Sequence, residues 1–177
     1  MNKSATRDAY GTLIEPTTLK IQRLLPGPVE RIWAWLVESD KRRKWLAAGE
    51  MELKVGAPFE LAWRNDELTD PPGKRPDGFG EEHRMHSRIT ALDEPRRIAF
   101  TWDGSGEVSI ELQQHGSDVL LTLIHRRLAN RKTMLGVSAG WHAHLDVLVA
   151  RMRGEEPGPF WDGMMKLRGD YDRRLPQ

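Results

Sequence analysis

The sequence predicts an α+β fold in which a curved antiparallel sheet of about six to seven strands wraps around one long C-terminal helix. Apolar side chains alternate at a period of two in successive segments between residues 51 and 127. The links between the later segments are only a few residues long, and strands joined so closely must be antiparallel. A long helical pattern follows, from about 132 to 153. A sheet that closes around this helix buries the apolar faces of both.

Ahead of these segments, the sequence predicts one strand and two short helices. Residues 18–25 alternate apolar and polar side chains, which is typical of a strand. Residues 29–39, which follow Pro28, have apolar side chains at the spacing of an amphipathic helix. A second short helix is expected from residue 39 or 40 to near Gly49.

Further strands and a second C-terminal helix complete the prediction. The expected strands are 51–55, 59–63, 81–92, 96–102, 106–114 and 117–127. Residues 64–80 are charged and rich in Pro and Gly, so we expect a long, exposed and mobile loop over a functional opening. The last helix is expected at about 160–173. Its apolar stripe must cover either the protein's own sheet or a neighbouring subunit, and consists of Phe160, Trp161, Met164 and Leu167.

The composition is that of a soluble globular protein without a strong charge bias. Lys and Arg total 27 against 26 Asp and Glu, so the net charge gives no general attraction to nucleic acid or to an anionic membrane. The absence of cysteine excludes disulfides and thiolate metal sites. The first twenty residues show no secretion signal, and no apolar run is long enough to span a membrane, so we expect a cytoplasmic protein. Seven tryptophans against two tyrosines indicate a core or a ligand cavity rich in indole rings.

Residues 136–140 read GVSAG and match the G-x-S-x-G pattern of serine hydrolases. That pattern needs a strand just before the serine, and an acid between the serine and a distant histidine. Here the helical pattern begins before Ser138, so no strand precedes the serine. His142 and His144 follow within six residues, with no acid between them and Ser138. We therefore interpret Ser138 as an ordinary helix residue. The small residues of this stretch are expected to let the helix lie close to the sheet.

The histidine spacings argue against a metal site. His142 and His144 would lie about 200° apart around a helix, so they cannot bind one ion together. His83 and His86 would point to opposite faces of a strand. No metal and no cofactor are expected. On the long helix, His142 is expected to face solvent, whereas His144 lies at the edge of the apolar stripe and can reach a cavity.

Inward-facing rows of apolar and aromatic residues give the candidate ligand-binding site. His125 continues the inward row of its strand near the end, where it can hydrogen-bond a ligand or serve only as a satisfied histidine at the rim. Trp45 is a candidate for the cavity mouth. The arginine pairs 42–43, 96–97 and 126–127 are interpreted as solvated. The candidate cavity residues are Trp45, Phe59, Leu61, Trp63, Phe100, Trp102, Leu123, His125, Trp141, His144, Leu145 and Leu148.

Three segments resemble a known family: RLLPGPVERIWAWLVESDKRRKWLAAGEM, RITALDEPRRIAFTW and GWHAHLDVLVARM. Together they are similar to the bacterial activator-of-Hsp90-ATPase-homologue (AHSA1-like, SRPBCC) family of the Bet v 1/START-like superfamily. The resemblance implies a helix-grip fold with a ligand cavity between sheet and helix and no fixed catalytic residues. The length of the chain predicts one domain over residues 1–177. The resemblance covers a core at about 15–155, and an additional C-terminal helix is expected within 156–177.

Three functions follow as hypotheses. The first is binding of a small hydrophobic or aromatic ligand in the cavity. The second is a cyclase or hydratase that uses a cavity histidine, although the nearby carboxylates Glu60 and Glu107 are out of phase with the apolar faces of their strands. The third is an interaction module, either a homodimer or a partner of a chaperone, since the family takes its name from co-chaperones of Hsp90.

Overall fold

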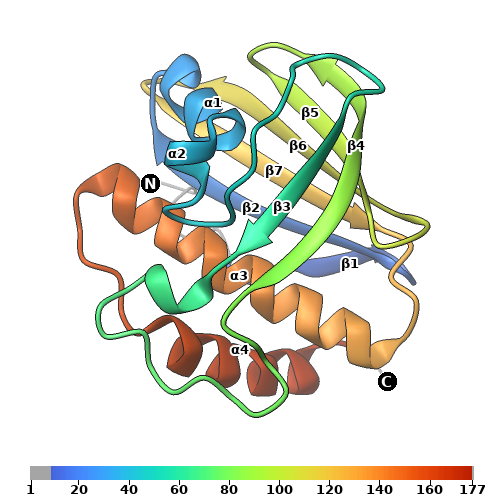
Figure 1. The fold of residues 1–177 in the computed structure, drawn as a ribbon, viewed down its shortest axis with the longest axis vertical. Coiled ribbons are helices and arrows are strands. Elements are labelled where there is room, and N and C mark those ends of the chain that lie inside the picture. Colours follow the sequence, from blue (N-terminus) through green and yellow to red (C-terminus); the bar gives the residue numbers. More distant parts are fainter. Residues whose placement is uncertain (1–8, 177) are drawn as a thin grey trace.

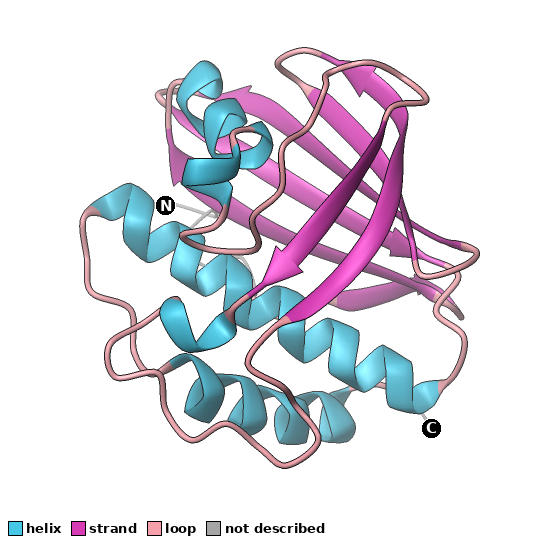
Figure 2. Ribbon diagram, in the orientation of Figure 1, coloured by secondary structure: helices cyan, strands magenta, loops and turns pink. Residues whose placement is uncertain are grey.

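A computed structural model describes residues 9–176 and shows a seven-stranded antiparallel sheet in the order β1-β2-β7-β6-β5-β4-β3 (Figures 1 and 2). The strands are β1 Thr12–Glu15, β2 Thr18–Pro26, β3 Pro58–Trp63, β4 His83–Asp93, β5 Arg97–Trp102, β6 Gly106–His115 and β7 Asp118–Arg126. The helices are α1 Val29–Val37, α2 Ser39–Arg42, the single 3-10 turn η2 Asn65–Glu67, α3 Arg131–Arg153 and α4 Phe160–Arg174.

The α3 helix occupies the middle of the molecule. It crosses the concave face of the sheet and packs against β2, while α4 packs on its other side (Figure 1). The short helices α1 and α2 close one end of the sheet (Figure 1). One continuous apolar cluster joins residues from the first helices, the sheet, α3 and α4. The predicted α+β architecture, a curved antiparallel sheet around a long helix, is confirmed.

Two details of the sheet differ from the prediction. Residues 51–55 alternate apolar and polar side chains but form no strand, and Val55 is 57% exposed. β3 is the edge strand of the sheet, and the pairing on its outer side is the isolated bridge between Ala48 and Ala62 rather than a further strand. The seventh strand is instead β1, a short and mostly exposed strand that pairs with β2.

The prediction that the arginine pair at 42–43 is solvated was wrong for Arg42. Its side chain is only 2% exposed and donates hydrogen bonds to the carbonyl oxygens of Leu36, Ala47 and Gly49. Burial lowers the pKa of Arg42 to about 10, so it remains charged at neutral pH. The chain wraps around this guanidinium, and α2 ends at Arg42 rather than near Gly49 as expected.

The face of α3 that was expected to meet solvent is covered by α4. His142 is only 4% exposed, and its Nδ1 lies 2.8 Å from the hydroxyl of Tyr171 on α4. The expectation that His142 faces solvent was therefore wrong, because the periodicity of one helix cannot show what packs behind it. The apolar stripe of α4 is buried within the same chain.

The loop 64–80 is held in place by the start of α4. The indole Nε1 of Trp161 donates to Asp66 at 2.7 Å, and the backbone N–H of Phe160 donates to the hydroxyl of Thr69 at 3.0 Å. Leu68 and Thr69 are buried, so the loop is not exposed throughout, as the sequence had indicated. None of the helices within residues 9–176 is long and apolar enough to cross a membrane.

We expect Arg42→Met to lower the free energy of unfolding by about 3 kcal/mol or more, because three carbonyl oxygens lose their donor and each unsatisfied buried group costs roughly 1–3 kcal/mol. Urea unfolding followed by circular dichroism measures this. Arg43→Met is the matched control. The side chain of Arg43 is about half exposed, so this substitution should change the free energy of unfolding by no more than about 0.5 kcal/mol. Equal effects of the two substitutions would contradict the assigned role of Arg42.

Candidate functional site

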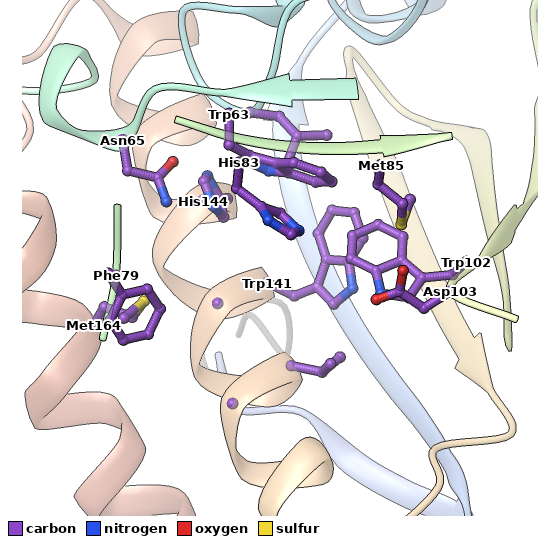
Figure 3. Close-up of a pocket in the computed structure, with 14 residues that line it drawn as sticks. Trp63, Asn65, Phe79, His83, Met85, Trp102, Asp103, Trp141, His144 and Met164 are labelled. Atoms are coloured by element: carbon purple, nitrogen blue, oxygen red, sulfur yellow. The ribbon is translucent and has the colours of Figure 1, made fainter. Parts of the chain in front are cut away.

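An apolar pocket of about 210 Å³ lies between α3, the ends of β3, β4 and β5, and α4 (Figure 3). Its walls come from elements far apart in the sequence, so only the folded chain assembles it. The lining residues are Leu46, Trp63, Asn65, Phe79, His83, Met85, Trp102, Asp103, Gly136, Val137, Gly140, Trp141, His144 and Met164.

Three indole rings form the main wall of the pocket. Trp63 ends β3, Trp102 ends β5, and Trp141 comes from the middle of α3. The ring centroid of Trp102 lies 5.5 Å from that of Trp63 and 5.3 Å from that of Trp141. Trp141 is fixed by a hydrogen bond of 3.0 Å from its Nε1 to Nδ1 of His125 on β7. This bond holds a flat apolar surface in one orientation.

Two glycines on α3 leave the space that the pocket occupies. A Cβ atom at Gly140 would meet no atom within 4 Å, and one at Gly136 would meet only a guanidinium nitrogen of Arg168, at 3.3 Å. The sequence had suggested that these small residues bring the helix close to the sheet. They face the pocket instead. Glycine inside a helix is less stable than alanine by roughly 1 kcal/mol, so the two glycines that leave this space open also destabilise α3.

His144 contributes a polar atom to the inner part of the pocket. The ring is buried, 6% exposed, and its Nδ1 lies 2.8 Å from the carbonyl oxygen of Trp45. Because a carbonyl only accepts hydrogen bonds, Nδ1 carries the proton. Burial lowers the pKa of His144 to about 4, against the opposing effect of the Trp45 carbonyl, so the ring is neutral at pH 7 and Nε2 is an acceptor.

The outer part of the pocket reaches solvent. Phe79, His83 and Asp103 line it and are exposed, with Phe79 at 48%. The ring of Phe79 packs on Trp161 of α4 at a centroid distance of 5.1 Å. The loop 64–80, which the sequence places over a functional opening, thus supplies one side of the pocket mouth.

Four of the twelve candidate cavity residues line this pocket: Trp63, Trp102, Trp141 and His144. The other eight lie outside it. Trp45, Phe59, Leu61 and Phe100 surround a void of only about 10 Å³, which is no larger than a single water. Leu123, His125, Leu145 and Leu148 are buried in the packed interior. Trp45 is therefore not at the mouth, since it is completely buried and its Nε1 donates to the carbonyl of Trp35.

Sequence reasoning missed ten lining residues, and two of them carried a usable signal. Gly136 and Gly140 stand one helical turn apart, close to Trp141, in a helix that contains no other glycine. Two glycines at this spacing leave a strip of the helix surface without side chains. Val137 lies on α3 beside Gly136, and Leu46 lies in the turn after α2. The remaining six lie at or near strand ends, in the loop or on α4, where spacing gives no information about what they face: Asn65, Phe79, His83, Met85, Asp103 and Met164.

The residues weighed for catalysis do not assemble into a catalytic group. Ser138 is completely buried and its hydroxyl has no hydrogen-bond partner among the described residues. Glu60 pairs with Arg84, and Glu107 accepts a bond from Thr90, in both cases away from the pocket. Within residues 9–176 no cluster of three or more His, Asp or Glu side chains is arranged to hold a metal ion.

We expect the protein to lose stability as the pH falls from about 6.5 to about 4. Burial lowers the pKa of His125 and of His144 to about 4, whereas a histidine in the unfolded chain titrates near 6.5. The unfolded chain therefore binds more protons in this window, and acid favours unfolding. At about 1.4 kcal/mol per pH unit, each histidine contributes a loss of up to about 3 kcal/mol, measurable by urea unfolding at pH 7.5 and 4.5.

His125→Asn is the matched variant, because its amide oxygen can accept the Trp141 bond but cannot titrate. It should show a smaller loss of stability between pH 7.5 and 4.5 than the parent protein. The interpretation would fail if both proteins lost the same free energy over this range.

Comparisons with known proteins place the chain in a family. A family model described as activator of Hsp90 ATPase homolog 1-like protein matches residues 26–153. A protein of Bordetella parapertussis solved by NMR is 38% identical, with a TM-score of 0.80 over 96% of this chain and 92% of that chain. No curated protein matches the chain.

More distant structures share the fold. CalU16 of Micromonospora echinospora is 20% identical, with a TM-score of 0.65 over 88% of this chain and 86% of its own. A conserved protein of unknown function from Enterococcus faecalis is 21% identical, with a TM-score of 0.67 over 96% of this chain and 91% of its own. The fold that they share is a long helix held in a curved antiparallel sheet. The matched model covers most of the chain, which thus belongs to the family of activator of Hsp90 ATPase homolog 1-like proteins.

Proposed function

We propose that this protein binds a small, planar, hydrophobic molecule in the pocket between α3 and the ends of β3, β4 and β5. The observation that carries the proposal is the wall of three indole rings beside two helix glycines. The rings of Trp63, Trp102 and Trp141 supply flat apolar surface, and the glycines leave room against it. Ligand sites are typically concave and mainly apolar, with a few polar groups that fix orientation.

The size of the pocket restricts the ligand. An apolar cavity of about 150 Å³ takes up a single benzene ring. The pocket here holds about 210 Å³ and opens to solvent beside Phe79 and Asp103. It therefore suits a body of about two fused rings, with any larger or more polar part of the molecule extending into water.

The pocket favours binding over acid–base catalysis. Its buried histidine, His144, hydrogen-bonds a backbone carbonyl and no carboxylate, and burial outweighs the effect of that carbonyl, so the pKa of His144 stays at about 4, far below neutral pH. The apolar stripe of α4 had suggested a protein partner, but this stripe is buried against the chain's own α3 and loop. We therefore rank the cyclase or hydratase and the interaction module below ligand binding.

A thermal-shift screen of planar aromatic compounds with one to three rings tests the proposal. A ligand present at a hundred times its Kd stabilises the folded state by about 2.7 kcal/mol. For a chain of this size we expect the Tm to rise by about 5–10 °C. No stabilisation by any compound of this class would overturn the proposal.

Gly140→Leu is the variant that blocks the pocket, because the new side chain projects into space where a Cβ meets no atom within 4 Å. We expect it to fold and to lose the ligand-induced rise in Tm. Gly163→Leu is the matched control: Gly163 is an exposed glycine of α4 that does not line the pocket, and a Cβ atom there would also meet nothing within 4 Å. Binding that survives in Gly140→Leu would place the ligand elsewhere.

A further inference from the structure

The chemistry of His144 restricts the ligand further than shape alone. The ring is held at the inner part of the pocket by the bond from its Nδ1 to the carbonyl of Trp45. That bond fixes the proton on Nδ1, so Nε2 presents a lone pair. Figure 3 shows His144 on the side of α3 that faces the end of β3, where Trp63 and Asn65 lie.

Nothing in the described part of the chain satisfies Nε2. The polar contact of the His144 side chain is made through Nδ1, and the ring otherwise packs on Phe160 at a centroid distance of 4.8 Å. Nε2 is not fully enclosed by the protein, so it faces the open pocket, where a bound ligand would displace water from it. A ligand with a donor satisfies this acceptor, whereas a ligand without one leaves it unpaired.

Asn65 also lines the pocket, and its side-chain oxygen is fully buried without a hydrogen-bond partner among the described residues. A ligand that offers only acceptors, or that carries a negative charge, would bring its lone pairs against the lone pair of His144 Nε2. A donor on the ligand avoids this repulsion.

The outer part of the pocket has the opposite character. Asp103 and His83 line it and are exposed to water. A polar or positively charged tail of the ligand can leave the pocket at this point, whereas the carboxylate of Asp103 disfavours an anionic one. The donor is thus needed on the ring system that enters the apolar part, and not on the tail.

We infer that the ligand is a fused-ring aromatic molecule that carries an N–H or O–H group on its ring system and donates it to Nε2 of His144. This inference rests on the proposed function. It names indole-like and phenol-like compounds as the class, and it makes His144 the residue that determines specificity.

Indole and benzofuran test the inference directly. The two molecules have nearly the same shape and size, but only indole has an N–H donor. We expect indole to bind the parent protein about five- to tenfold more tightly than benzofuran, as measured by isothermal titration calorimetry at pH 7.5.

Two substitutions separate the roles of the two ring nitrogens. His144→Asn keeps an N–H that can reach the Trp45 carbonyl and removes the acceptor at the position of Nε2. It should bind indole and benzofuran with equal affinity. His144→Gln places an amide near the position of Nε2, and it should restore at least part of the preference for indole. Circular dichroism and the benzofuran affinity show that each variant keeps a folded pocket.

The outcomes of this experiment distinguish the two proposals. Equal binding of indole and benzofuran to the parent protein would overturn the inference and leave the proposed function standing. A preference for indole that persists in His144→Asn would also overturn it. Binding of neither compound to the parent protein, together with no response to larger aromatics, would overturn the proposed function and the inference with it.

Discussion

The structure depends on one constraint: the middle of α3 has no side that faces solvent. Five consecutive residues, Trp141 to Leu145, are all buried. Consecutive residues of a helix point about 100° apart, so five of them cover the full circumference. One side of the helix is covered by the concave sheet, and the other requires a second layer. The α4 helix is that layer, which is why His142 hydrogen-bonds Tyr171 in place of water.

The same constraint explains where the pocket lies. Towards its C-terminal end α3 presents Leu145, Leu148 and Met152, whose side chains fill the interior. Towards its N-terminal end it presents Gly136 and Gly140, and the interior is open. The backbone of α3 has the same width throughout. The size of its side chains therefore decides whether the space between helix and sheet is filled as core or left open as a pocket.

Periodicity predicted the elements well because it reports which face of an element is buried. The strand 18–25, the strands from 59 to 127 and both long helices follow directly from it. It failed at residues 51–55, where an alternating pattern forms no strand, and at β1, where a short exposed strand has almost no pattern. It also could not separate core from cavity, because Phe59 and Trp63 share a face of β3 while only Trp63 lines the pocket. That difference depends on how far opposing side chains reach.

The features that give this pocket its character lie partly outside the segment that defines the family. The family model ends at residue 153, before α4 begins. Yet α4 supplies Met164 to the pocket wall, and its Phe160 packs on the ring of His144. Its Trp161 also supports Phe79 at the mouth. An alignment with the Bordetella parapertussis protein that omits only 4% of the chain must include most of α4, so this helix is shared with that relative. The common core therefore provides the sheet and the helix that form most of the pocket, whereas α4 adds Met164 to its wall and covers one side of the His144 ring with Phe160.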